Sequence, residues 1–316
     1  MLVLNILVLL IALYLIVKFS DIFVDAATSL AHCFKVPKMV IALTVAAFST
    51  CAPELAISFN SISSGNADMT LANVIGSLVI NILLIIGVAA IVKPIKLKGR
   101  TIRRELPLLL LITTAFFFLM NDSFYKNSLN SLSRVDGIIL IILFVIFCLY
   151  IVSITRKNKE DIESKPIYTK KQSIIMIICA IIGIIITSDL IVDSAVFIAE
   201  SLNISQKFIA MTVIVIGTSL PELTITVLSA KKGEFDMAIG NIIGTNIFNI
   251  CVVLGLPVTI FGAVYSSSFN LIDMIIVLLA ALLLSIFGTS DRELSRREGI
   301  VMLLVVIVYY LYLFIM

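Results

Sequence analysis

Gly217-Thr218-Ser219-Leu220-Pro221-Glu222 lies inside a long apolar stretch of the sequence, and Ser49-Thr50-Cys51-Ala52-Pro53-Glu54 lies inside an earlier one. A carboxylate is costly in such surroundings unless it has a partner. A proline there has no N–H to donate and crowds the preceding turn, which frees the carbonyl four residues earlier. A second polar group follows each stretch, at residues 73–81 and at residues 241–249. These four stretches predict one polar site inside an apolar protein.

The composition indicates a membrane protein. The chain has 316 residues, of which 60% are hydrophobic and 14% charged, and its mean hydropathy is +1.17. Several apolar stretches reach about 18 residues, the length that a helix needs to cross hydrocarbon. Only helices and closed barrels satisfy their backbone polar groups in lipid, and the sequence shows no barrel-like alternation. We therefore predict an all-α integral membrane protein in contact with lipid. The first apolar stretch has no basic segment before it, so no cleavable signal peptide is expected.

Ten spans can be assigned, and their loops predict an orientation. Most of the 23 basic residues fall in alternate loops, which the positive-inside rule places in the cytoplasm, so both termini are predicted outside. We expect a multi-pass protein of the cell membrane, of prokaryotic type. The predicted units are residues 1–155, a cytoplasmic linker at 156–172, and residues 173–316. The predicted spans are 2–33, 39–64, 70–92, 105–120, 135–154, 173–201, 208–230, 237–261, 270–288 and 299–316.

An internal duplication relates the two halves. Adding 168 to a residue number converts Glu54 to Glu222, and the same offset carries the first copy onto the second without gaps from about residue 20 to residue 87. Each half holds five spans, an odd number, so the second copy is inverted in the membrane relative to the first. Inverted repeats with broken helices at their interface are typical of secondary transporters. The matching pairs at the polar stretches are Thr50 and Thr218, Pro53 and Pro221, Glu54 and Glu222, Asn73 and Asn241, Gly76 and Gly244, Ser77 and Thr245, Asn81 and Asn249.

The polar side chains at these positions are hard oxygen donors. Thr50 and Glu54 are four residues apart and share a helical face, as are Ser77 and Asn81 and their counterparts in the second half. Such oxygens suit Ca²⁺, which takes six to eight of them, or Na⁺. Zinc and copper are disfavoured, because the five cysteines show no metal-ligand spacing and His32 is the single histidine. Gly76 and Gly244 are expected to let helix backbones approach closely.

These motifs resemble the alpha repeats of the Ca²⁺/cation antiporter superfamily, and most closely those of prokaryotic and archaeal sodium/calcium exchangers. The resemblance covers nearly the whole chain. Residues 217–222 together with residues 240–246 form a highly specific match. The first copy is looser, since Ser49 and Cys51 replace the usual glycine and serine.

The resemblance implies four cation positions, and it implies that spans 1 and 6 slide across them. The central Ca²⁺ position would use Glu54, Glu222, Thr50 and Thr218. An inner Na⁺ position would use Glu54, Ser77, Thr50 and the carbonyl of Ala47. An outer Na⁺ position would use Glu222, Thr245, Thr218 and the carbonyl of Val215. A middle position would use Asn81 and Asn249 beside both glutamates.

One departure from the family concerns charge. Relatives often carry an aspartate at one of the positions that match Asn81 and Asn249, whereas this chain has asparagine at both. Two carboxylates neutralise one Ca²⁺, but three Na⁺ would leave an excess positive charge. The charge count therefore leaves the number and kind of counter-ions open.

The predicted function is a Ca²⁺/Na⁺ antiporter that works by alternating access. Exchange of Ca²⁺ for H⁺, or for another monovalent cation, stays open, and a cation channel is a more distant alternative. An enzyme is not expected, because no nucleophile–base pair accompanies the acids, and neither a bound cofactor nor nucleic acid is expected. The remaining intramembrane acids, for which capping, pairing or lining an ion path are the alternatives, are Asp21, Asp25, Asp189 and Asp193.

Overall fold

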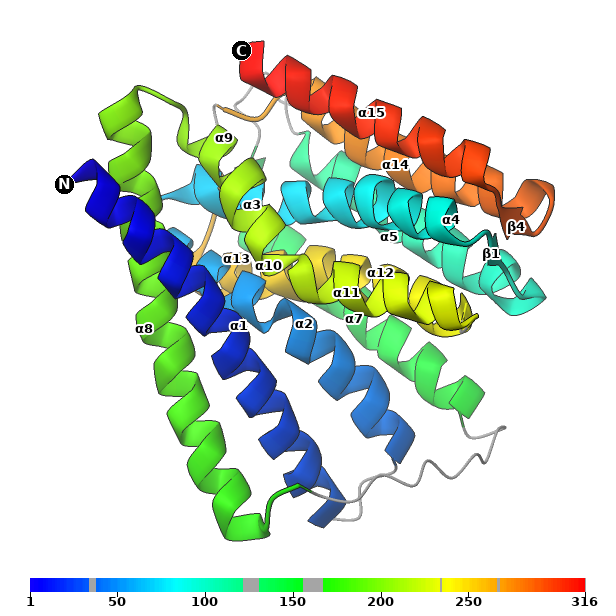
Figure 1. The fold of residues 1–316 in the computed structure, drawn as a ribbon, viewed down its shortest axis with the longest axis horizontal. Helices are drawn as coiled ribbons and strands as arrows, with labels where there is room; N and C mark the ends of the chain where they lie inside the picture. The colour runs from blue at the N-terminus through cyan, green and yellow to red at the C-terminus, as the bar shows by residue number, and fades with distance from the viewer. Residues whose placement is uncertain (34–37, 122–130, 156–166, 234, 266–267, 316) are drawn as a thin grey trace.

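A computed structural model describes residues 1–33, 38–121, 131–155, 167–233, 235–265 and 268–315. Helices make up nearly all of this part of the chain (Figure 1). Within it, all ten stretches predicted as spans are helical. The helices of the first half are α1 (Leu2–Cys33), α2 (Lys38–Ser63), α3 (Ala67–Val79), the π-helix η1 (Ile80–Ile86), α4 (Gly87–Val92), the π-helix η2 (Thr101–Glu105), α5 (Leu106–Met120) and α7 (Arg134–Thr155).

The second half repeats this order of helices. The predicted sixth and seventh spans correspond to α8 (Lys170–Leu202), α9 (Gln206–Ile209), the π-helix η3 (Ala210–Ile214), α10 (Val215–Thr218) and α11 (Leu220–Lys232). The last three predicted spans correspond to α12 (Phe235–Phe248), the π-helix η4 (Asn249–Leu254), α13 (Gly255–Phe261), α14 (Leu271–Ser290) and α15 (Arg296–Ile315).

Among the described residues, seven helices or helix runs are long and apolar enough to cross a membrane, and the bent pair formed by Lys207–Thr218 and α11 adds an eighth. The other two predicted spans form α2, with 26 residues, and α5, with 15 residues. The chain is thus a predominantly helical protein with several membrane-spanning helices. The linker residues 156–166 lie outside the described part.

Local sequence signals explain where several helices begin and end. Thr169 and Gln172 form a reciprocal capping box at the start of α8, and Asn270 and Asp273 form another at the start of α14. Helix α11 is capped at its end by Gly233, whose φ of 84° is a left-handed conformation that glycine adopts at little energetic cost. These caps satisfy backbone groups that would otherwise be exposed near the membrane surface.

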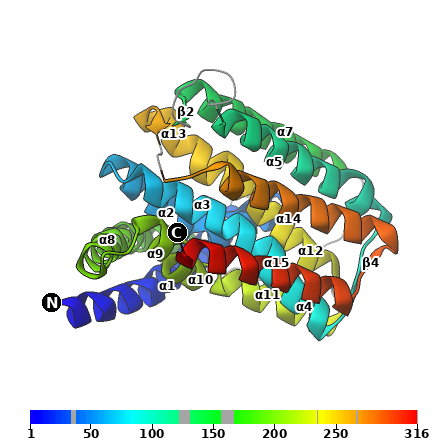
Figure 2. The same ribbon diagram turned by 90° about the horizontal axis from the view of Figure 1, so that it is seen from above.

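The two longest helices, α1 and α8, form a separate pair. They have 32 and 33 residues, which at about 1.5 Å per residue exceeds the thickness of the hydrocarbon core. They pack along each other and against α2, and they project from the rest of the molecule (Figures 1 and 2). These two helices are therefore too long to cross the core perpendicular to the membrane without extending past it. Many of their large apolar side chains face outward, as lipid contact requires.

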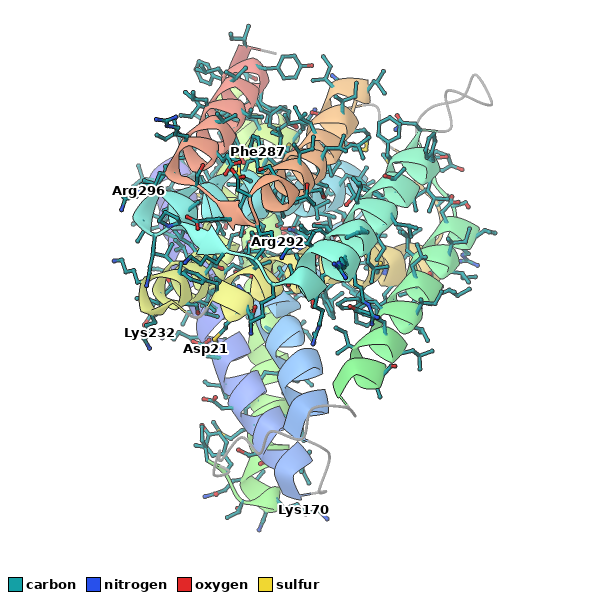
Figure 3. The ribbon with its side chains drawn as sticks, turned by 90° about the vertical axis from the view of Figure 1, so that its right-hand side faces the viewer. Asp21, Lys170, Lys232, Phe287, Arg292 and Arg296 are labelled. Atoms are coloured by element: carbon teal, nitrogen blue, oxygen red, sulfur yellow. The ribbon has the colours of Figure 1, made fainter. Side chains whose placement is uncertain are left out.

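Four two-residue strands correct the purely helical prediction. Strand β1 (Ile95–Lys96) pairs with β4 (Glu293–Leu294), and β2 (Ser131–Leu132) pairs with β3 (Val264–Tyr265), both antiparallel. Each pair joins a loop of the first half to a loop of the second. The sequence did not reveal them, because two-residue strands are too short for any alternation of polar and apolar residues. Figure 3 shows Lys232, Arg292 and Arg296 on the face that carries the β1–β4 pair.

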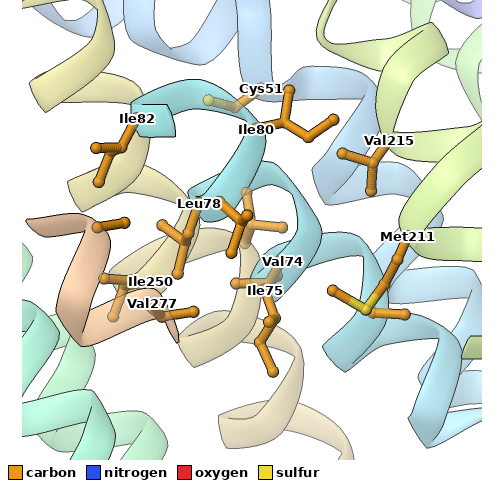
Figure 4. Packing of buried hydrophobic residues seen from close by; sticks show 14 of the residues in the cluster. Cys51, Val74, Ile75, Leu78, Ile80, Ile82, Met211, Val215, Ile250 and Val277 are labelled. Carbon is orange, nitrogen blue, oxygen red and sulfur yellow. The ribbon is translucent and has the colours of Figure 1, made fainter. Parts of the chain in front are cut away.

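Two helix runs form the centre of the molecule, α3–η1–α4 and α12–η4–α13. They are the most buried candidate spans, with 83% of the apolar stretch of each inside the protein, against 17% for α7. Figure 4 shows the side chains of Ile75, Leu78 and Ile250 packed in this core. Both runs also carry polar residues of the predicted site, which are therefore held in the best-packed part of the fold.

Candidate cation site

The second copy of the motif breaks its helix. Helix α10 ends at Thr218, Ser219 leaves helical geometry with ψ near 3°, and α11 starts at Leu220. The two pieces of this span are bent by 49°. Pro221 lies in the first turn of α11, where its missing N–H costs nothing, and Glu222 follows it. The carboxylate is fully buried at the positive end of the α11 dipole.

The first copy does not break its helix. Helix α2 runs as one element from Lys38 to Ser63 with Pro53 inside it. The expectation of matching broken helices in the two halves is therefore wrong for the first half. Glu54 lies one residue beyond this proline and is buried, with 1% of its surface exposed. The halves thus present their glutamates from different backbone conformations.

Glu54 and Thr218 meet across the two halves. The side chain of Thr218 lies beside the Glu54 carboxyl and interacts with it, although 164 positions separate them in the sequence. The Thr218 Oγ1 also lies 3.3 Å from the carbonyl oxygen of Val215. The structure thus brings together a carboxylate of the first motif and a hydroxyl of the second.

Asn73 and Asn241, the first residues of the second polar stretch in each half, each connect two helices of their own half. Asn73 donates from Nδ2 to Ser58 Oγ at 3.2 Å and to the Glu54 carbonyl at 3.0 Å. Asn241 donates from Nδ2 to Thr226 Oγ1, also at 3.2 Å. Adding 168 to 58 and to 73 gives 226 and 241, so the two braces are equivalent. They fix α3 against α2 and α12 against α11.

Several buried oxygens of the duplicated stretches have no hydrogen-bond partner in the described part of the chain. A buried polar atom without a partner costs about 1–3 kcal/mol, and a bound cation is one way to satisfy such oxygens. Their positions fall in both halves, and three of them belong to residues predicted as ligands in the second motifs. The oxygens are Glu54 Oε2, Asn81 Oδ1, Ser219 Oγ, Thr245 Oγ1 and Asn249 Oδ1.

The predicted asparagines lie at matching irregularities of the helices. Asn81 lies in η1 and Asn249 lies in η4, π-helices that follow α3 and α12. A π-helix shifts the backbone hydrogen-bond pattern by one residue and is frequent at functional sites. The Asn81 Nδ2 lies 3.4 Å from the Oδ1 of Asn246, which joins the two central runs directly.

The remaining predicted ligands vary in their surroundings. Ser77 is buried and donates its hydroxyl to the Asn73 carbonyl at 2.7 Å. The Val215 carbonyl already accepts the Ser219 N–H at 2.9 Å. Ala47 and Thr50 occupy positions within α2, but their side chains lie outside the described residues. The structure therefore does not test their predicted role.

The aspartates of spans 1 and 6 lie away from the central oxygens. Asp21 pairs with Lys18 at 3.8 Å, and both side chains are more than half exposed. Asp189 accepts a hydrogen bond from Asn60 of α2, so it links α8 to the central helices. Asp193 is exposed on α8. Pairing describes Asp21 and Asp189 better than a place in the cation site does.

Comparison with known proteins assigns the family. The family model described as sodium/calcium exchanger protein matches residues 4–153 and 172–315, which is most of the chain. The chain belongs to the sodium/calcium exchanger family. This exchanger is 35% identical to the putative antiporter CaxA of Alkalimonas amylolytica, over 96% of this chain and 97% of that protein. It is 30% identical to the sodium/calcium exchanger MaX1 of Methanosarcina acetivorans, over 99% of each chain.

Its fold is similar to that of a solved exchanger. The structure of the sodium-calcium exchanger NCX_Mj soaked with 2.5 mM Na⁺ and 10 mM Sr²⁺ matches with a TM-score of 0.66 at 30% sequence identity. The match covers 98% of both chains. The exchanger is therefore a membrane antiporter of the cation/Ca²⁺ type, a transporter class and not an enzyme class.

Sequence reasoning overlooked one residue that joins the halves. Asn246 contacts Asn81 across the centre, but subtracting 168 gives Leu78, so the internal repeat does not single it out. Its polarity within the apolar run of α12 was the available signal. No group of three or more His, Cys, Asp or Glu residues that could hold a metal ion lies together among the described residues.

Proposed function

We propose that this exchanger moves Ca²⁺ across the cell membrane in one direction and Na⁺ in the other by alternating access. In this proposal ten spans form two inverted five-helix repeats, with both termini outside. The observation that carries it is the meeting of Glu54 of the first motif with Thr218 of the second in a buried region. A duplicated motif that converges in this way serves one cation site made by both repeats.

The chemistry of the buried oxygens supports Ca²⁺ as one cargo ion. Glu54 and Glu222 together carry two negative charges when ionised, which one Ca²⁺ neutralises. Hydroxyl and amide oxygens without partners supply the further ligands that a hard cation needs. In the proposed assignment the Ca²⁺ ligands are Glu54, Glu222, Thr50 and Thr218. The Na⁺ positions add Ser77 and the Ala47 carbonyl, Thr245 and the Val215 carbonyl, and the middle position adds Asn81 and Asn249.

Na⁺ is the favoured counter-ion because neutral oxygens dominate the site. A proton needs only a carboxylate, whereas Na⁺ needs several oxygens around it. Ca²⁺ and Na⁺ would compete for the same atoms, so only one kind of cargo crosses in each half-cycle. The names of the relatives differ on this point: MaX1 is named a sodium/calcium exchanger, and CaxA is named only a putative antiporter.

Uptake of ⁴⁵Ca²⁺ into proteoliposomes tests the counter-ion. Vesicles are loaded with Na⁺, K⁺ or buffer at a different pH, and each gradient is imposed alone. We expect rapid, saturable uptake of ⁴⁵Ca²⁺ only into Na⁺-loaded vesicles. Uptake driven by the pH gradient would identify a Ca²⁺/H⁺ exchanger, and flux without any counter-ion gradient would identify a channel.

Substitution of the two glutamates tests the site itself. We expect Glu54→Gln and Glu222→Gln each to abolish uptake, because each removes a charge that must be balanced by cargo before the barrier is crossed. Glu200→Gln is the matched control, since Glu200 is exposed near the end of α8. Size-exclusion profiles in detergent verify folding. Full transport by both glutamine variants would exclude the proposed site.

A further inference from the structure

The backbone just before α10 lacks one regular helical hydrogen bond. In an α-helix the Val215 N–H would bond the carbonyl of Met211, four residues earlier. In η3 that N–H instead bonds the carbonyls of Ala210 and Thr212. The carbonyl of Met211, a fully buried residue, is thereby left available. Such a carbonyl needs a donor from elsewhere in the protein.

Tyr310 of α15 supplies that donor. Its hydroxyl donates to the Met211 carbonyl at 2.6 Å. The neighbouring Tyr309 hydroxyl donates to Asp273 Oδ1 at 2.7 Å and lies 3.9 Å from the Met211 sulfur. Helix α15 therefore contacts η3 through a hydrogen bond that matches the irregularity of the π-helix.

A buried ion pair fixes the start of the same span. Lys207 Nζ lies 2.6 Å from Asp273 Oδ2, and the two side chains are 7% and 0% exposed. Lys207 also donates to the Ser268 carbonyl at 3.0 Å and lies over the Phe269 ring at 4.4 Å. The segment that leads to α10 is thus held at its start as well as at Met211.

Gly76 of α3 packs against the other side of the η3–α10 segment. A Cβ added at Gly76 would lie 2.8 Å from Val215 Cγ2 and 3.3 Å from Met211 Cα. Figure 4 shows Met211 and Val215 on this segment beside α3. Met211 and Val215 therefore pack closely against Gly76, and the Met211 carbonyl is held by the Tyr310 hydroxyl.

The first half lacks the lysine of this arrangement. Subtracting 168 from 207, within the range over which the offset holds, gives Met39. Helix α2 also contains no π-helical segment. The contacts around η3 are therefore not a general requirement of the repeated five-helix unit.

We propose that Tyr310 is a positioning residue for the cation ligands that follow η3, the Val215 carbonyl and the Thr218 hydroxyl. By holding the Met211 carbonyl it stabilises the π-helix, and the π-helix sets the rotation of α10. This role rests on the proposed function of Val215 and Thr218. It assigns to a residue outside the duplicated motifs an effect on the outer Na⁺ position.

The test compares Tyr310→Phe with Tyr312→Phe. Tyr312 lies on the same helix and accepts a hydrogen bond from Asn270, but it does not contact η3 by any hydrogen bond that the structure shows. The half-saturating concentrations of Na⁺ and Ca²⁺ are measured in proteoliposomes, and the melting temperature in detergent is measured at increasing Na⁺. Because one buried hydrogen bond is lost, we expect the half-saturating concentration of Na⁺ to rise about three- to tenfold in Tyr310→Phe.

The relative effect on Na⁺ and Ca²⁺ distinguishes a positioning role of Tyr310 from a general effect on protein stability. We expect Tyr310→Phe to weaken the binding of Na⁺ more than the binding of Ca²⁺, since the Val215 carbonyl belongs only to the Na⁺ position. Tyr312→Phe should leave the ratio of the two half-saturating concentrations unchanged. Equal changes for both cations, or the same shift in both variants, would overturn the proposal. If the wild-type protein transports Ca²⁺ without Na⁺, the proposed counter-ion fails. The Na⁺-dependent melting temperature of Tyr310→Phe then still decides whether Tyr310 positions a Na⁺ site.

Discussion

Replacing Gly76 by alanine should displace the second-half ligands through the first half. The new methyl would lie 2.8 Å from Val215 Cγ2 and 3.3 Å from Met211 Cα. Carbon atoms at rest lie about 3.5–4.0 Å apart, so α3 and the η3–α10 segment must separate by roughly 1 Å. Overpacking of this kind costs about 1–3 kcal/mol, against a gain of about 1 kcal/mol from helix propensity. The net expectation is a loss of up to about 2 kcal/mol.

The effect on transport should exceed the effect on stability. A shift of about 1 Å in positioned groups can cost about 100-fold in rate, and the shifted segment carries Val215 and Thr218. We therefore expect ⁴⁵Ca²⁺ uptake by Gly76→Ala to fall at least about tenfold, while the protein still elutes as a folded species in detergent.

Gly244→Ala is the matched control for this prediction. Gly244 is the repeat counterpart of Gly76, but an added Cβ there would meet nothing within 4 Å. Its transport and melting temperature should stay close to those of the wild type. Equal behaviour of the two variants would refute the inferred close packing of α3 against η3 and α10.

The remaining predictions concern charge. Lys207→Met leaves Asp273 buried without its cation, so the melting temperature in detergent should fall by the equivalent of about 3–5 kcal/mol; an unchanged value would show that Asp273 is not ionised in the folded protein. Asn249→Asp adds a third carboxylate, so the reversal potential of Ca²⁺ flux should shift toward a larger number of Na⁺ per Ca²⁺; an unchanged potential would show that net charge does not set the ratio. Glu54→Gln and Glu222→Gln should abolish uptake, as described above.

The sequence predicted the membrane class and the four polar stretches well, because both follow from local signals. An apolar stretch of sufficient length must be helical in lipid, and an intramembrane acid beside proline is rare without a role. The fixed offset between Glu54 and Glu222 then predicted that the two motifs face each other. The contact between Glu54 and Thr218 bears out that convergence, while the ligand assignments stay predictions.

The features that the sequence did not predict depend on tertiary contacts. The offset suggested equal roles for Gly76 and Gly244, but Gly244 lies in open space. It also suggested that Pro53 and Pro221 would both break their helices, yet α2 continues through Pro53. Proline weakens a helix in either setting, and the packing of neighbouring helices decides whether the helix continues. That packing cannot be inferred from a single sequence.

These differences show how a duplicated site becomes asymmetric without losing its ligands. In the first half Glu54 is presented by an uninterrupted helix, which the Asn73 brace holds to α3. In the second half Glu222 follows a break, and the segment before the break is held by Tyr310 and by Lys207, whose counterpart in the first half is Met39. The motifs therefore supply matching oxygens, while residues outside them set the backbone that presents those oxygens. Substitutions within the motifs should remove cation binding from both halves alike, whereas substitutions around η3 should alter the second half alone.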